Sequence, residues 1–170
     1  GVIIDISPYF FMNLVKYHSS FADQISQLFH QAVQHIDHAI YSKAQLDAWS
    51  FAPRSAQYWH KRLKHMYCLV MLQEDRCIGF IAMETHFKQQ GYIAHLYIAP
   101  EFQGQSIATQ LFESVLQYAQ SLDYAQLIVD ASSLSAPLFR LHGFIRQSRC
   151  YQLQRGQMLP ALVMRKSLLV

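Results

Sequence analysis

Residues 95–112, HLYIAPEFQGQSIATQLF, constrain the fold more than any other part of the chain. A short apolar run ends at Pro100, a Gln-Gly turn follows, and an amphipathic helical pattern begins at Ile107. A strand that turns tightly into a helix presents free backbone N–H groups and the positive end of the helix dipole. That geometry is typical of a site for a phosphate-bearing ligand. An ordinary strand–turn–helix connection has the same local sequence, so both interpretations stay open on this segment alone.

Composition and charge narrow the class of protein. With 170 residues, of which 52% are hydrophobic and 15% charged, we expect one globular domain over residues 1–170, with residues 1–10 as an N-terminal extension. The net charge of +3 comes without a Lys/Arg run. This argues against nucleic acid as the main partner and mildly favours an anionic ligand.

The sequence also predicts where the protein resides. No apolar stretch reaches membrane-spanning length, and Asp5 stands where a signal peptide carries positive charge. Cys68, Cys77 and Cys150 are an odd number of cysteines without C-x-x-C spacing, which favours reduced thiols over a disulfide framework or a zinc site. We therefore expect a cytoplasmic protein with no metal and no membrane partner.

The periodicity of apolar residues predicts a mixed fold. Apolar runs predict strands at residues 12–17, 67–72, 77–85, 92–99, 127–131, 144–152 and 162–166. Apolar spacings of three and four predict helices at residues 22–36, 42–49, 55–64, 107–122 and 135–142. Antiparallel strands come first and a β-α-β crossover follows. This order predicts an α/β (α+β) fold, with a mixed, mostly antiparallel central sheet and helices on both faces.

Two spaced motifs resemble the signatures of the GNAT superfamily of N-acetyltransferases. The first is residues 98–100, IAP, followed by residues 103–108, QGQSIA, which resemble the acetyl-CoA signature of a strand ending in Val/Ile-x-Pro and then Q/R-x-x-G-x-G/A. The second is residues 135–144, SAPLFRLHGF, a short helix that ends in a Gly-Phe pair. The resemblance covers residues 21–166. Residues 41–49, YSKAQLDAW, and the run that begins with DASS at residue 130 also resemble a bacterial branch of small acetyltransferases. It implies a GNAT-type acyl-CoA N-acyltransferase fold.

The resemblance implies acetyl-CoA as the co-substrate. The backbone of Leu96 and Ile98 would pair with the pantetheine amides, and the diphosphate would lie on the loop at residues 103–108. Ser132, where many relatives carry Asn, would bind the pantetheine. Arg140 would bind the nucleotide phosphates, or it is a solvated helix residue. The expected cofactor-binding residues are Leu96, Tyr97, Ile98, Gln103, Gly104, Gln105, Ser106, Ile107, Ala108, Thr109, Ser132, Phe139 and Arg140.

Two residues depart from the family pattern. Ser106 replaces the middle glycine of the signature, which costs about 1–3 kcal/mol if the position has a positive φ. The helical spacing begins at Ile107, so we expect Ser106 already in the first helical turn, where serine is comfortable.

Phe139 stands where many relatives carry a Tyr that is thought to protonate the leaving thiolate. A CoA thiol with a pKa near ~8.5 is a tolerable leaving group, so Phe139 argues against that acid and not against catalysis.

The implied reaction is direct attack of an amine on the thioester. An amine with a pKa near ~10 is mostly protonated at pH 7, so some group must take its proton. Glu84 and His95, on central strands, are the candidate bases, although a lone polar residue on a strand more often has a structural role. Tyr97 and Tyr151 are candidate replacement acids. Tyr97 is the weaker one because it alternates along its strand with the residues that face the cofactor.

The resemblance also implies that the Ile98 backbone N–H meets the tetrahedral oxyanion. The acceptor stays open between a small molecule and a peptide amine, and a homodimer is one assembly to test. Aromatic residues in the segment 38–60 either line an apolar or cation-binding pocket or pack the helices on the sheet. Three functions remain: an acetyltransferase, a non-catalytic acyl-CoA-binding or sensing domain, and a structural protein whose glycine turn binds nothing.

Overall fold

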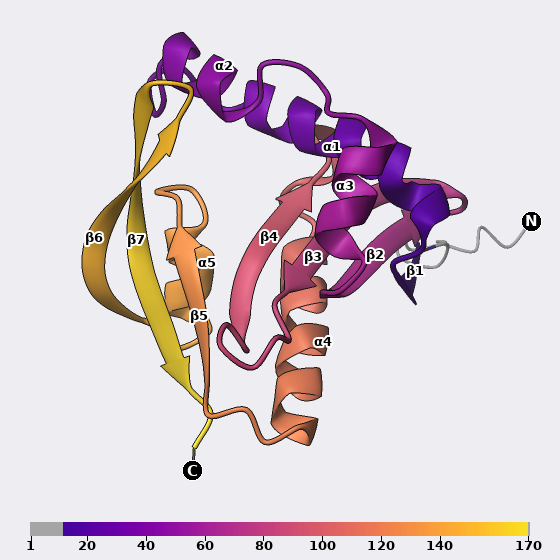
Figure 1. Ribbon diagram of the computed structural model, residues 1–170, viewed down its shortest axis with the longest axis vertical. Coiled ribbons are helices and arrows are strands. Elements are labelled where there is room, and N and C mark those ends of the chain that lie inside the picture. Colours follow the sequence, from indigo (N-terminus) through magenta and orange to yellow (C-terminus); the bar gives the residue numbers. More distant parts are fainter. Residues whose placement is uncertain (1–11, 170) are drawn as a thin grey trace, which may run out of the picture.

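The computed structural model describes residues 12–169, and a seven-stranded sheet lies at its centre (Figure 1). The expected extension at residues 1–10 lies outside the described residues. The strands are β1 (Met12–Lys16), β2 (Tyr67–Gln73), β3 (Arg76–Met83), β4 (Tyr92–Ile98), β5 (Gln126–Ala131), β6 (Ile145–Gln154) and β7 (Gln157–Ser167). The helices are α1 (Ala22–Gln34), α2 (Lys43–Trp49), α3 (Ala56–Leu63), α4 (Ile107–Ser121) and α5 (Ala136–Leu141), with short 3-10 helices η2 (Ser19–Phe21) and η3 (Pro100–Phe102) before α1 and α4. Within residues 12–169, no helix combines the length and the apolar character that crossing a membrane requires.

The strand order is β1-β2-β3-β4-β5-β7-β6, and neighbouring strands are antiparallel except for β4 and β5. The predicted hairpin is β2–β3, which closes with Gln73 paired to Arg76. The predicted crossover is β4–α4–β5, which produces the parallel pair. The predicted fold class, a mixed and mostly antiparallel sheet with helices, is confirmed.

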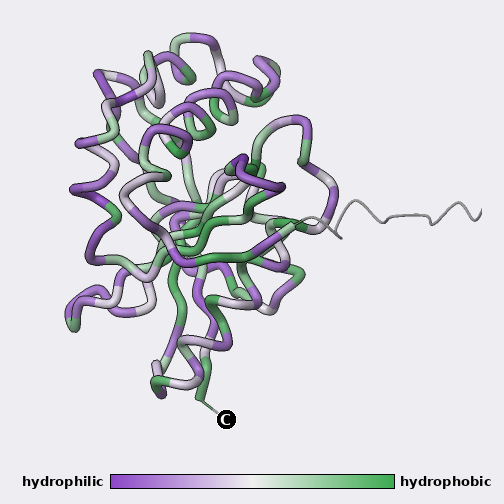
Figure 2. Tube along the Cα trace, turned by 90° about the vertical axis from the view of Figure 1, so that its right-hand side faces the viewer, coloured by the Kyte–Doolittle hydropathy of each residue, from purple (hydrophilic) through white to green (hydrophobic). Residues whose placement is uncertain are grey.

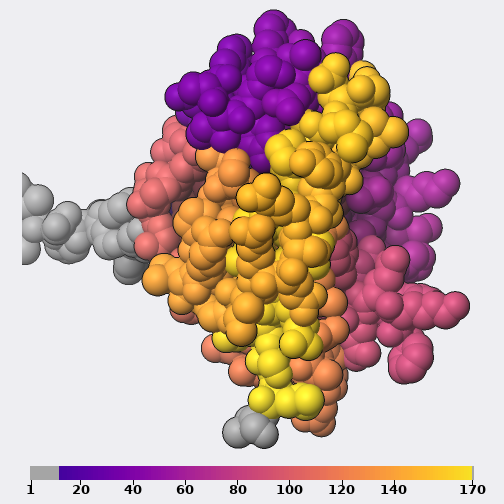
Figure 3. Space-filling view, turned by 90° about the vertical axis from the view of Figure 1, so that its left-hand side faces the viewer, coloured from indigo at the N-terminus to yellow at the C-terminus, as the bar shows by residue number. Residues whose placement is uncertain are grey.

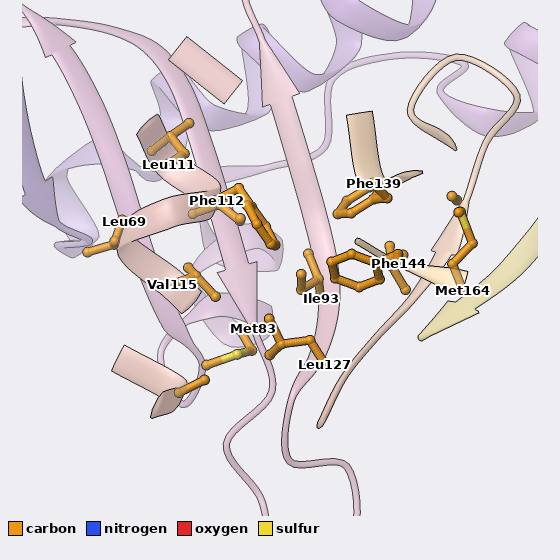
Figure 4. Close-up of a cluster of buried hydrophobic side chains, with 14 of the residues drawn as sticks. Leu69, Met83, Ile93, Leu111, Phe112, Val115, Leu127, Phe139, Phe144 and Met164 are labelled. Atoms are coloured by element: carbon orange, nitrogen blue, oxygen red, sulfur yellow. The ribbon is translucent and has the colours of Figure 1, made fainter. Parts of the chain in front are cut away.

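Helices cover both faces of the sheet, and each face has its own apolar core. On the face covered by α4 and α5, Phe112, Phe139 and Phe144 pack together (Figure 4). On the other face, α1 and α3 pack around Trp59 and Phe80. Figure 2 shows the most hydrophobic segments running through the strands between these layers. The central strands β2 and β3 are therefore buried on both faces, whereas the edge strand β6 is exposed.

Serine caps determine where α2 and α3 begin. The Ser42 hydroxyl accepts from the N–H of Gln45 at 3.1 Å, and the Ser42 N–H donates to the Gln45 side chain at 2.9 Å. Ser55 accepts from the N–H of Tyr58 in the same way, at 3.1 Å. These caps satisfy N–H groups that have no partner inside the helix. The helices predicted at residues 42–49 and 55–64 thus correspond to α2 and α3.

The closing hairpin is longer than predicted. β7 begins at Gln157 and not at residue 162, and β6 ends at Gln154 and not at residue 152. Arg155 (φ +43) and Gly156 (φ +81) form a two-residue turn with left-handed backbone, which matches the twist of antiparallel strands. Pro160 is tolerated because β7 pairs there with β6 alone, so one edge of the strand is free of the ladder.

The tip of this hairpin contacts the segment around α2. Gln45 Nε2 donates to the Met158 carbonyl at 3.2 Å, and the Tyr41 hydroxyl donates to the Pro160 carbonyl at 3.3 Å. In Figure 3 the indigo helices and the yellow C-terminal strands meet near the top of the molecule. The start of α2 and the first half of β7 are thereby held together.

Candidate active site

β4 and β5 run side by side for a short distance and then part. Their ladder consists of two pairs, Tyr92 with Ile128 and Ile93 with Val129. Beyond these pairs the strands diverge (Figure 1). A cavity of about 750 Å³ opens at this point, bordered by both strands, the loop before α4, α5, the α1–α2 segment and β7. A cavity of this size is typical of a site for a small molecule or a cofactor.

A bulge interrupts β4 where the strands part. Ala82 of β3 pairs with His95, whereas Met83 pairs with Ile93. Ala94 is therefore an extra residue in β4 that no residue of β3 opposes. The bulge shifts the alternation of the side chains by one residue. The face to which a residue after the bulge points therefore cannot be counted from the residues before it.

After the bulge, successive residues of β4 point to opposite faces of the sheet. Leu96 and Ile98 pack into the core under α4. Tyr97 packs on the other face, its ring centroid 4.6 Å from that of Phe29 in α1. His95 lies on that same face, its ring 5.2 Å from Trp59 in α3. The expectation that Tyr97 points away from the face of Leu96 and Ile98 is confirmed.

The backbone of β4 presents an open edge to the cavity. The Ala99 N–H donates to the Ile78 carbonyl in the β3 direction, at 2.8 Å. Because the polar groups of successive residues alternate between the two edges of a strand, Leu96 and Ile98 direct theirs toward β5, where the ladder has ended. The Ile98 carbonyl accepts from the Gln103 side chain at 3.2 Å. An extended ligand could pair with this edge as an added strand would.

The loop between η3 and α4 forms the rim of the cavity. Gly104 and Ser106 both have positive φ, +79 and +64. Ile107 begins α4, a helix of 15 residues whose first N–H groups have no partner within the helix. These groups and the helix dipole make the rim favourable for an anion.

The prediction that Ser106 belongs to the first helical turn is wrong. It is the N-cap residue of α4, its backbone is left-handed, and its side chain makes no capping hydrogen bond. The chain must reverse direction between η3 and α4 within four residues, and two left-handed residues accomplish the reversal. For a residue with a Cβ this conformation costs about 1–2 kcal/mol.

A family model described as an acetyltransferase (GNAT) domain matches residues 37–168. The chain belongs to the GNAT acetyltransferase family. A comparison with curated protein sequences finds no significant match. The predicted membership in this family is confirmed.

Solved structures of GNAT proteins share the fold. A GCN5-related N-acetyltransferase from Rhodopseudomonas palustris superimposes with a TM-score of 0.84 at 24% identity, over 92% of this chain and 95% of that one. YncA from Salmonella typhimurium, solved with its cofactor acetyl-CoA, gives 0.67 at 16% identity over 93% and 94%. The PaiA N-acetyltransferase from Thermoplasma acidophilum, solved with coenzyme A, gives 0.71 at 13% identity over 92% and 98%.

Most residues expected to bind the cofactor surround the cavity of this GNAT domain. All of them except Gln105 and Arg140 line it. The Gln105 side chain donates to the Glu101 carbonyl at 3.5 Å, and Arg140 lies exposed on α5. Their contacts with a cofactor stay predictions, as do those of the lining residues.

Phe139, at the position where the resemblance implies a tyrosine, is a buried hydrocarbon ring. Phe139 is 1% exposed, and its ring lies 6.1 Å from Phe112 and 5.0 Å from Phe144 while it also lines the cavity. Ser132 and Ser135 bring hydroxyl groups to the same wall, with their Oγ atoms 3.2 Å apart. Phe139 cannot donate a proton. If the leaving thiolate is to be protonated, another group must supply the proton.

Two of the predicted catalytic residues lie outside the cavity. Tyr151 is 60% exposed on β6 and does not border it. Glu84, just after β3, lines a separate hollow of about 570 Å³ together with Arg62. The two spaces share Tyr92 and Ala94 in their walls, so Glu84 is adjacent to the cavity without facing into it.

His95 and Tyr97 do line the cavity, and burial changes the proton affinity of both. Burial, together with the Arg62 guanidinium 3.3 Å from His95 Nε2, lowers the pKa of this imidazole to about 3. An imidazole with so low a pKa accepts a proton poorly at neutral pH, which disfavours His95 as the base. Burial raises the pKa of Tyr97, so its phenol keeps its proton.

Two residues of the site, Tyr92 and Asp130, were missed by sequence reasoning. Tyr92 of β4 donates a hydrogen bond from its hydroxyl to Asp130 Oδ2 of β5, at 3.0 Å, and both line the cavity. Tyr41, one of the aromatic residues of the segment 38–60, is 2% exposed, accepts from the Ser133 N–H at 3.3 Å and lines the cavity as well. A signal for Asp130 was present, since it is a charged residue within an otherwise apolar strand.

Among residues 12–169, no three His, Cys, Asp or Glu side chains form a cluster able to hold a metal ion.

Proposed function

We propose that this GNAT domain transfers an acetyl group from acetyl-CoA to the primary amine of an acceptor. The observation that carries the proposal is the open backbone edge of β4, which borders a cavity with an anion-favouring helix N-terminus at its rim. The relatives from Salmonella typhimurium and Thermoplasma acidophilum, solved with acetyl-CoA and coenzyme A, support this assignment.

The cofactor would occupy the space between β4 and β5. The pantetheine amides pair with the backbone of Leu96 and Ile98, and the diphosphate rests on the loop at residues 103–108. The Gln103 side chain, which is bonded to the Ile98 carbonyl, ties this loop to β4. The thioester then lies near the point where the strands part, with the acceptor on the side of His95 and Tyr97.

The reaction needs no covalent enzyme intermediate. The acceptor loses a proton to water, and the nitrogen lone pair of the neutral amine attacks the thioester carbonyl carbon. The oxyanion that forms receives a hydrogen bond from the Ile98 N–H. The C–S bond then breaks, the amine nitrogen gives up its second proton, and the thiolate takes a proton to give coenzyme A. Tyr97 lies on the opposite face of the strand and burial raises its pKa, which makes its phenol a weak acid, so water in the cavity is the candidate donor.

A second function is favoured by one observation. Phe139 removes the usual proton donor, and a GNAT domain without that donor could bind acyl-CoA as a sensor without transferring the acyl group. The two functions share the cofactor site and differ in turnover.

Two assays separate them. Calorimetric titration of acetyl-CoA should show saturable binding under both functions. Release of free thiol from acetyl-CoA across a panel of primary amines should depend on the amine if the protein is an enzyme. Saturable binding without thiol release from any amine supports the sensor, and the absence of binding contradicts both.

A further inference from the structure

A carboxylate faces the cavity at the point where β4 and β5 part. Asp130 follows Val129, the last residue of β5 that pairs with β4. Val129 and Ala131 pack into the core under α4, so Asp130 points to the opposite face of the sheet by alternation. That is the face of Tyr97, away from the side where Leu96 and Ile98 pack.

Tyr92 holds this carboxylate in place. Its hydroxyl donates to Asp130 Oδ2 at 3.0 Å. Burial and the Asp130 charge raise the pKa of Tyr92, so the phenol remains a donor. Within residues 12–169 the ion pairs are Lys43–Asp47 and Arg76–Glu101, and neither involves Asp130. The carboxylate therefore has a positioning partner and no cation of its own.

The Asp130 end of the cavity favours a positively charged ligand. Its acidic lining residues are Asp37 and Asp130, and no Lys or Arg of the described chain lines it. Arg62 reaches His95 Nε2 at 3.3 Å from the neighbouring hollow, and the low pKa of His95 keeps that imidazole neutral. The rings of Tyr41, Trp49 and Tyr97 also line the cavity, and aromatic faces attract ammonium groups.

We propose that Asp130 binds the ammonium group of the acceptor, with Tyr92 as a positioning residue, and that the site selects amines without a carboxylate next to the amine. The inference rests on the proposed acetyltransferase function and deepens it. An ammonium group donates hydrogen bonds to the Asp130 carboxylate and supplies the positively charged partner that this carboxylate lacks in the protein. An α-amino acid would place its own carboxylate against Asp130 with no Lys or Arg to pair with it, and such like-charge contacts oppose binding.

The wild-type protein provides the first test. Thiol release is measured at saturating acetyl-CoA with tyramine and tyrosine, histamine and histidine, and tryptamine and tryptophan. Each pair differs by one carboxylate beside the amine. In every pair that is turned over, we expect kcat/KM to be at least tenfold higher for the decarboxylated member. Equal values within a pair overturn the proposal.

Variants provide the second test. Asp130→Asn keeps the shape of the side chain and removes its charge. We expect kcat/KM for the preferred amine to fall at least tenfold, while the Kd for acetyl-CoA stays within twofold. Tyr92→Phe should raise KM for the amine more than it lowers kcat. The control is Asp123→Asn, an exposed aspartate outside the cavity, which should leave both parameters unchanged.

The outcomes distinguish the two proposals. If the wild-type protein releases thiol with amines but Asp130→Asn keeps kcat/KM within twofold, the assignment of Asp130 is wrong and the acetyltransferase function stands. If no amine promotes thiol release while acetyl-CoA binds, the acetyltransferase function is wrong, and the acceptor site falls with it.

Discussion

The two faces of β4 offer different kinds of group to a ligand. On the side of α4, the features available to a cofactor are mainly backbone: the open edge at Leu96 and Ile98 and the turn that leads into α4. On the side of α1, the features are side chains held by other side chains, such as Asp130 held by Tyr92. Backbone features follow from topology, so one fold can retain a cofactor site while side chains change the acceptor.

The difference between the two faces of β4 also separates the affinity for the cofactor from the rate of turnover. Replacing a side chain on the acceptor side should alter the rate and leave the cofactor affinity unchanged. Changing the backbone of the loop should alter the cofactor affinity first. The following substitutions test whether the two faces can be perturbed independently.

The largest expected effect is on the cofactor face. Gly104→Val places a β-branched residue at a φ of +79 and should lower the affinity for acetyl-CoA at least tenfold, because the strained loop no longer holds its N–H groups in position. Calorimetric titration measures the change.

Gly156→Val is the matched control. Gly156 has a φ of +81, and a Cβ at either glycine meets no atom within 4 Å, but Gly156 lies in the β6–β7 turn. Both variants should lose about 1–2 kcal/mol of unfolding free energy, and acetyl-CoA binding should fall only for Gly104→Val. A similar loss of affinity in both variants would mean that the loop is not the binding element.

The next largest effect concerns how the leaving thiolate of coenzyme A receives its proton. Phe139→Tyr places a phenol on the cavity wall and should raise kcat about threefold to tenfold, below the ~100-fold at which general acid contributions typically start, because the thiolate is already a tolerable leaving group. Steady-state thiol release at saturating substrates measures kcat. The same change at the neighbouring ring, Phe144→Tyr, adds a hydroxyl that does not face the cavity and should give no gain. If Phe139→Tyr lowers kcat instead, another group already supplies the proton.

A smaller effect concerns His95 and acid stability. The pKa of His95 is about 3 in the folded protein and ~6.5 in an unfolded chain, so the unfolded state binds more protons between these values. The free energy of unfolding should therefore fall as the pH falls below 6.5, and His95 should account for about 1 kcal/mol of the loss between pH 7.5 and 5.5. Urea denaturation of the wild type and His95→Gln at both pH values measures this share. An equal decline in both proteins would place the acid sensitivity elsewhere.

The smallest effect concerns Ser106. Ser106→Gly removes the left-handed strain at φ +64, while glycine adds entropy to the unfolded chain, so the net gain should be about 0.5–1 kcal/mol in unfolding free energy. Because the Ser106 side chain makes no capping bond, nothing else is lost. Urea denaturation measures the gain, and a destabilised variant would contradict the strain.

The sequence predicted those parts of the fold that depend on local pattern. Strand β4, helix α4 and the short helix α5 were predicted within one or two residues at each end, because apolar period, turn residues and caps are all local. The left-handed backbone of Ser106 was not predictable, because the spacing at Ile107 fits either conformation. The length of β7 was underestimated because the Arg155–Gly156 turn was not recognised.

Side-chain geometry of the acceptor face could not be predicted in the same way. Tyr92 and Asp130 are 38 residues apart and meet only because β4 and β5 are adjacent. Glu84 was predicted within a strand at residues 77–85, but β3 ends at Met83 and the Glu84 side chain lines another hollow. Such pairings depend on the three-dimensional arrangement of strands, which the periodicity of a sequence does not specify residue by residue.

A crystal structure of the protein with acetyl-CoA tests the central claim most directly. We predict that the pantetheine lies between β4 and β5 with its amides bonded to the backbone of Leu96 and Ile98. The diphosphate should contact the N–H groups of residues 103–108, and the thioester should face Asp130. A cofactor bound elsewhere, or strands β4 and β5 closed against each other in the complex, would contradict the account.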